Sequence, residues 1–124
     1  VQYCSDAVWG FFEEMKRIGK QDQVAIFVHS EFGRRVPENT NLGTDHGTAN
    51  VAFVLGGGVK GGMTYGASDD FGFAAVENKV HVHDLHATIL HLMGLDHEKL
   101  TFRYSGRDFR LTDVHGSVVK PILA

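Results

Sequence analysis

The sequence contains little cysteine and little proline. Among its 124 residues there are two prolines and a single cysteine, Cys4. One cysteine permits no internal disulfide and excludes a zinc finger built from several cysteines. The absence of disulfides leaves the cellular compartment open.

Long apolar runs and an excess of positive charge are also missing. No stretch reaches the ~20 apolar residues that a membrane-spanning helix needs, and the first residues lack the pattern of a signal peptide. Lys and Arg number 12 against 15 Asp and Glu, which gives a formal net charge of -3. This balance argues against a protein that binds nucleic acid by neutralising phosphates. We therefore expect neither a membrane span nor a nucleic-acid partner.

What the chain does contain is an ordinary globular composition, with 43% hydrophobic and 22% charged residues. A chain of this length forms one domain at most. It begins at Val1 and soon enters a helical pattern, which is typical of an internal segment of a longer protein. We expect residues 1–124 to be a single unit, the C-terminal segment of a larger domain.

The apolar pattern predicts alternating helices and strands. A helix is expected from Ser5 and Asp6, which can cap it, to Gly19, which can end it. The apolar runs at residues 24–28 and 51–55 are typical of strands covered on both faces, as in a parallel sheet. A second helix is expected from Asp84 to Gly94, and short strands at residues 101–104 and 108–111 suggest a C-terminal hairpin. The predicted fold is α/β, with a mostly parallel sheet and a small appended hairpin.

The candidate site lies between the two apolar runs. Glu31 follows the first run, Asp45 and His46 precede the second, and Arg34 lies between them. Carboxylates and imidazole are ligands for divalent metals such as zinc, calcium or magnesium. Arginine suits tetrahedral oxyanions because its guanidinium group is planar and always charged. The stretch therefore predicts part of a metal and oxyanion site.

Two other features have competing interpretations. Residues 56–61 contain the spacing G-x-G-x-x-G, which binds dinucleotides only if a helix follows at once; a tight glycine turn is the simpler interpretation. Eight histidines invite a metal site, yet no H-E-x-x-H pattern is present. We expect those around the second helix to be capping or partly buried residues, and His97 and His115 to be surface turn residues.

The order of these motifs resembles a known family. The motifs are S-E-F-G-R at residues 30–34, G-T-D-H-G at residues 43–47, the glycines at residues 56–58, and H-D-L-H-A-T-I-L-H-L-M-G-L at residues 83–95. They are similar to the C-terminal part of the sulfatase-like family called domain of unknown function 1501, within the alkaline phosphatase superfamily. The resemblance covers roughly residues 5–115.

The resemblance implies an α/β/α sandwich and hydrolysis of phosphate or sulfate esters at a one- or two-metal site. It implies a periplasmic or secreted location, and a nucleophile in the N-terminal half, outside this segment. Two alignments are possible. Either Asp45-His46 is the family's Asp-His metal-binding pair, or Glu31-Phe32 takes that place and His46 is a later ligand. We prefer the second, in which Phe32 stands where a ligand histidine is expected.

The functional expectation is a fragment of a metal-dependent phosphatase- or sulfatase-like hydrolase. Glu31, Asp45 and His46 are the candidate metal ligands, and Arg34 is the candidate catalytic residue that holds the oxyanion. The alternative is a non-catalytic binding or structural remnant of the same fold. In either case the segment alone is expected to be inactive and to need the rest of its own domain or self-association.

Overall fold

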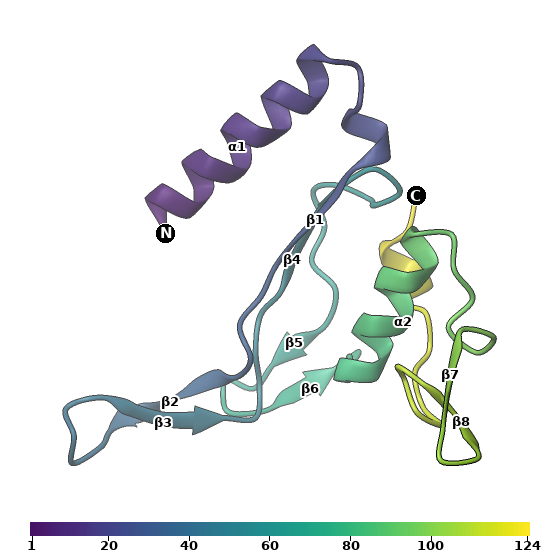
Figure 1. The fold of residues 1–124 in the computed structure, drawn as a ribbon. Helices are drawn as coiled ribbons and strands as arrows, with labels where there is room; N and C mark the ends of the chain where they lie inside the picture. The colour runs from purple at the N-terminus through teal and green to yellow at the C-terminus, as the bar shows by residue number, and fades with distance from the viewer.

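The computed structural model describes residues 1–124. Two α-helices and four two-stranded antiparallel sheets make up the fold (Figure 1). The helices are α1 (Gln2–Arg17) and α2 (Val82–Leu92), with short 3-10 helices η1 (Gln21–Gln23) and η2 (Lys120–Ile122). The strands are β1 (Ala25–Val28), β2 (Gly33–Glu38), β3 (Thr44–Gly47), β4 (Phe53–Gly56), β5 (Ala67–Ser68), β6 (Ala75–Glu77), β7 (Thr101–Tyr104) and β8 (Arg107–Arg110). Neither helix is long and apolar enough to cross a bilayer.

The predicted α/β/α sandwich with a parallel sheet is wrong for this chain. The two apolar runs do form strands, but β1 and β4 pair antiparallel, with Ala25 opposite Gly56 and Val28 opposite Phe53. Parallel neighbours need a crossover connection, usually a helix. Residues 29–52 instead contain the hairpin β2–β3 and no helix, so the chain doubles back and β4 returns beside β1. An apolar run indicates a strand, but the connection decides its direction.

Helix α1 ends as predicted but begins earlier. Gly19 follows it with a φ of +68°, its N–H donates to Lys16 O, and the Lys20 N–H donates to Met15 O. These two bonds are a Schellman motif, which satisfies the last carbonyls of a helix. The predicted cap at Ser5 and Asp6 is wrong, because the helix starts at Gln2 without a side-chain cap. None of its residues is buried, and it lies apart from the sheets in Figure 1.

Helix α2 begins with a capping box in which His81 is the N-cap. Its imidazole accepts a hydrogen bond from the His83 N–H, and the Asp84 carboxylate accepts one from the His81 N–H. Asp84 is thus the third helical residue rather than the first, because the helix already begins at Val82. Gly94 ends the helix with a second Schellman motif, as the sequence predicted.

The buried core is small and lies around α2. Thr88 Oγ1 accepts a hydrogen bond of 2.9 Å from the Val119 N–H, which fixes the C-terminal segment to the helix. The exposed surface is 9376 Å², whereas a compact protein of 13.7 kDa has about 6,600 Å². Most of the chain outside α2 is therefore open. The buried residues are Ala87, Thr88, Leu90, Thr112 and Val119.

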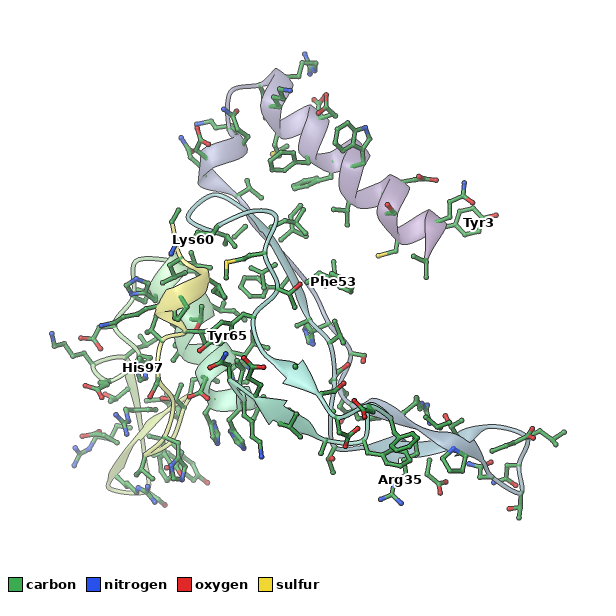
Figure 2. All side chains as sticks on the ribbon, turned by 180° about the vertical axis from the view of Figure 1, so that it is seen from behind. Tyr3, Arg35, Phe53, Lys60, Tyr65 and His97 are labelled. Atoms are coloured by element: carbon green, nitrogen blue, oxygen red, sulfur yellow. The ribbon has the colours of Figure 1, made fainter.

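The glycine-rich stretch is a turn, as the simpler interpretation predicted. No helix follows Gly61, so the dinucleotide-binding interpretation is wrong. The turn instead meets the C-terminal segment: the Lys60 N–H donates to Ile122 O, and the Ala124 N–H donates to Gly58 O. Figure 2 shows Lys60 beside this segment. After this turn the chain is irregular until β5.

The C-terminal hairpin is confirmed, with its second strand starting one residue earlier than predicted. Thr101 of β7 pairs with Arg110 of β8, and Tyr104 pairs with Arg107. Ser105 and Gly106 form the two-residue loop, both with positive φ, which matches the twist of a hairpin. The hairpin is a sheet of its own and is not added to another sheet.

Candidate functional site on the β2–β3 hairpin

The predicted site residues all lie on or beside the hairpin β2–β3. Glu31 is in the bend before β2, Arg34 is on β2, and Asp45 and His46 are on β3. The register places Arg34 opposite His46. The hairpin therefore makes Arg34 and His46, which are twelve positions apart in the sequence, neighbours on adjacent strands.

One asparagine organises the far end of this hairpin. Asn39 Oδ1 accepts hydrogen bonds from the backbone N–H groups of Asn41 and Gly43. Asparagine favours such turns because its side chain imitates a backbone carbonyl. Leu42 takes a φ of +57° in this loop. The spacing of Asn39, Asn41 and Gly43 is the signal for this turn in the sequence.

The base of the hairpin is held by Ser30 and Asn50. The Ser30 hydroxyl lies 3.2 Å from Asn50 Oδ1, and the Asn50 amide nitrogen donates to Ser30 O. Gly33 lies directly against the Ala49 carbonyl, where a Cβ atom would overlap the oxygen. The sequence reasoning missed Asn50 and Gly33, since nothing in the linear order shows that residues 30 and 50 meet.

Three side chains form a layer on one face of the hairpin, which we call the Phe32 stack. The Phe32 and His46 rings are nearly parallel, with centroids 3.4 Å apart. The Arg34 guanidinium carbon lies 4.8 Å from the centroid of the Phe32 ring, a cation–π arrangement. Arg34 Nη1 also donates to Thr44 O at 2.7 Å. The stack therefore fixes the position of a cation beside an imidazole.

The other two predicted residues are placed differently. Asp45 Oδ1 accepts a hydrogen bond of 3.0 Å from Asn39 Nδ2. Successive residues of a strand face opposite sides, so Asp45 lies on the face away from His46. Glu31 is exposed and its side chain makes no hydrogen bond. Arg35 donates from Nε to His46 O on the neighbouring strand β3.

A metal centre is not completed by the side chains of this chain alone. No group of three or more His, Cys, Asp or Glu lies close enough together to hold an ion. The alternation of Asp45 and His46 across β3 is one physical reason. Glu31, Asp45 and His46 stay predicted ligands, and a complete centre requires further donors.

A second cluster lies at the start of α2. A hollow of about 690 Å³ is lined by three histidines together with an aspartate and a turn. The expectation that this group contains capping and partly buried histidines is confirmed for His81 and for His83. His97 is not a plain surface residue, because its Nδ1 lies 3.0 Å from the hydroxyl of the buried Thr112. The lining residues are His81, His83, Asp84, Val114, His115, Gly116 and Ser117.

Comparison with known families gives one match. The family described as Protein of unknown function (DUF1501) matches residues 2–123, almost the entire chain. The chain belongs to this family. No curated protein matches it, and no solved structure does. The match confirms the family resemblance drawn from the motifs, while membership of the DUF1501 family carries no assigned activity. The wider relation to sulfatases and alkaline phosphatases stays a prediction.

Proposed function

We propose that this DUF1501 chain is one segment of a larger hydrolase domain that cleaves phosphate or sulfate esters, related to the alkaline phosphatase superfamily. In this proposal the β2–β3 hairpin supplies the group that binds the oxyanion of the substrate. The observation that carries the proposal is the Phe32 stack, which holds the Arg34 guanidinium beside His46.

Arg34 has the donors that an ester oxyanion needs. A guanidinium group carries five N–H donors in a fixed plane, and Arg34 uses one nitrogen on Thr44 O. Its remaining donors are free on an exposed strand. Because phosphate and sulfate groups accept two parallel hydrogen bonds from arginine, a guanidinium already held in place loses little freedom on binding.

The remaining parts of the active site come from elsewhere in the proposed domain. Glu31 and His46 are the preferred metal ligands of this segment, because Asp45 is on the opposite face of β3 and is bonded to Asn39. They do not make a complete centre, so further donors and the nucleophile lie outside residues 1–124 in this proposal. Hydrolysis by this segment alone is not expected.

The open surface supports the larger domain. The chain exposes 9376 Å², about 40% more than a compact protein of its mass. Helix α1 has an apolar face of which no residue is fully buried, and Phe53 on β4 is 63% exposed. Burial of such side chains is the main favourable term in folding, so further protein surface packed against α1 and β4 is the simplest partner.

A non-catalytic role is the second candidate, and Phe32 favours it. This residue stands where the family resemblance places a ligand histidine, and its ring covers one face of the His46 imidazole. In this alternative the same Arg34 binds an oxyanion without turnover.

The test uses the full-length protein that contains this segment, assayed with p-nitrophenyl phosphate and p-nitrophenyl sulfate. We expect Arg34→Ala to lower kcat/KM by about 100-fold or more, as loss of a charge-stabilising donor does. Arg103→Ala is the matched control, because Arg103 is an exposed arginine that pairs only with Asp108 on the far β7–β8 hairpin. We expect it to leave kcat/KM unchanged.

Two results would redirect the proposal. Turnover that survives both Arg34→Ala and His46→Ala would remove the hairpin from the active site. No turnover by the full-length protein, combined with binding of inorganic phosphate that Arg34→Ala abolishes, would support the non-catalytic role instead.

A further inference from the structure

The hollow at the start of α2 brings three imidazoles together from two parts of the chain. His81 and His83 are on the first turn of α2, and His115 comes from the turn after β8. The ring centroids of His81 and His83 are 4.9 Å apart, and those of His83 and His115 are 5.8 Å apart. The chain thus places three ionisable rings around one space.

The His115–Ser117 segment is held on α2 by one carboxylate and one glycine. Asp84 Oδ2 accepts from the His81 N–H at 2.9 Å, and Asp84 Oδ1 accepts from the Ser117 N–H at 2.7 Å. Gly116 has a φ of +94°, and a Cβ atom there would lie 2.8 Å from His83 O. The segment therefore lies closer to the helix than any other residue type would allow.

The cap of α2 works only while His81 is neutral. His81 Nδ1 accepts the hydrogen bond of the His83 N–H at 3.3 Å. A ring nitrogen accepts only through an unprotonated lone pair, so the proton of the neutral ring is on Nε2. Serine, threonine or asparagine caps keep their acceptor oxygen at any ordinary pH. An imidazole cap is lost once the ring takes a second proton.

Protonation also crowds like charges around the hollow. Its titratable lining consists of three histidines and Asp84, and one carboxylate can offset only one of three positive charges. The N-terminal end of a helix is itself positive, so α2 adds to the repulsion. Loss of the cap and repulsion between rings act in the same direction.

Other uses of the hollow fit the geometry less well. No three of its side chains converge as metal ligands. An anion would need several free amides on the first turn, but the His81 and His83 N–H groups are bonded within the capping box, which leaves only the Val82 N–H.

We propose that the first turn of α2 and the His115–Ser117 segment form a proton-sensitive clamp. The clamp is closed when His81, His83 and His115 are neutral, and it opens when these imidazoles are protonated. Opening frees the His83 and Ser117 amides and widens the hollow. The remainder of α2 stays folded, because the bond from the Val119 N–H to Thr88 Oγ1 involves no titrating group.

Amide hydrogen exchange of the full-length protein tests the clamp at about pH 7.5 and about pH 5. Protection factors remove the intrinsic dependence of exchange on pH. We expect His83 and Ser117 to lose about fivefold or more of their protection at the lower pH, which is the usual effect of a lost cap. The Leu95 amide, which bonds to Leu90 O at the other end of α2, is expected to keep its protection.

Two variants and one direct measurement separate the causes. His81→Asn keeps an acceptor at the cap at both pH values, so His83 protection is expected to become independent of pH. His115→Gln removes one charge, so Ser117 opening is expected to need a lower pH. Nitrogen NMR of the wild type at neutral pH is expected to show His81 with its proton on Nε2. A proton on Nδ1, or equal loss of protection in His81→Asn, would overturn the clamp.

Discussion

Helices α1 and α2 end in the same way but differ completely in what they bury. Both finish at a glycine with positive φ and a Schellman motif. Helix α2 carries three of the five buried residues, whereas α1 carries none. The signals that start and stop a helix are local, and both helices have them. Burial depends on what packs against a helix, and only α2 has a partner within residues 1–124.

The same contrast separates the C-terminal segment from the β2–β3 hairpin. Residues 117–124 lie on α2 and on the glycine turn through bonds to Asp84, Thr88 and Gly58. The hairpin is held by bonds within its own loop and at its base. Figure 1 shows it extending away from the body of the molecule. The candidate site is thus on an open part of the chain, which is where a missing partner would be expected to dock.

The largest expected effect comes from truncating the core of α2. Leu90 is 7% exposed, so Leu90→Ala removes buried apolar volume and is expected to cost about 2–5 kcal/mol of unfolding free energy. Urea denaturation followed by circular dichroism measures this difference.

Phe11→Ala on α1 is the matched variant that tests the difference in burial between α1 and α2. Phe11 is 46% exposed, so its truncation in residues 1–124 alone is expected to cost under about 0.5 kcal/mol. In the full-length protein the same variant is expected to cost about 3–5 kcal/mol, because the proposed larger domain covers this face. A negligible cost in both proteins would contradict the larger domain.

A smaller effect is expected from the buried hydroxyl that joins α2 to the C-terminal segment. Thr88→Val keeps the shape of the side chain but leaves the buried Val119 N–H without an acceptor, at a cost of about 1–3 kcal/mol. Thr48→Val is the control, because the Thr48 hydroxyl is exposed and only donates, to Phe73 O. Equal losses of stability in the two variants would mean that the buried position of the Thr88 hydroxyl does not increase its contribution to stability.

The sequence predicted the local features of this fold well. Gly19 and Gly94 end their helices, residues 101–104 form a strand, and residues 56–62 form a turn without a helix after it. Each depends on the conformational preference of a few neighbouring residues, which a single sequence records. The cap predicted at Ser5 and Asp6 is wrong, because the helix already includes both residues and begins at Gln2 without a side-chain cap.

The long-range features could not be obtained in the same way. Strands β1 and β4 were recognised as apolar runs, but their antiparallel pairing depends on how residues 29–52 fold. Arg34 and His46 were both selected as site residues from their chemistry, whereas their register and the contact through Phe32 needed the hairpin. The hydrogen bond between Ser30 and Asn50 at the base of the hairpin cannot be recognised from the linear sequence.

An effect of similar size is expected where the hairpin meets its base. Gly33→Ala places a methyl group on the Ala49 carbonyl, so the strand must shift, at a cost of about 1–3 kcal/mol. The shift also displaces Arg34, which follows directly. Gly61→Ala is the control, because a Cβ atom there meets nothing within 4 Å. Phosphate binding by the full-length protein is expected to weaken in the first variant and to stay unchanged in the second.

The smallest expected effects come from one exposed acid near the end of each helix. The two hydrogen bonds from Arg17 lower the pKa of Glu14. The backbone N–H of Glu98, with a smaller contribution from Lys99, lowers the pKa of Asp96. Each acid therefore stabilises the fold at pH values above its ordinary pKa, and this contribution disappears as the pH falls through the lowered value.

Added salt is expected to affect the contributions of Glu14 and Asp96 differently, as measured by the urea midpoints of wild type and variants. Because an exposed ion pair is screened by salt, the difference between wild type and Glu14→Gln at neutral pH should shrink on addition of about 1 M NaCl. The difference between wild type and Asp96→Ala should largely persist, since its main partner is an uncharged backbone amide. In acid, well below the lowered pKa of each group, both differences should vanish except for the hydrogen bond that protonated Asp96 keeps. Equal sensitivity to salt would show that the Lys99 ion pair, and not the amide, is the main partner of Asp96.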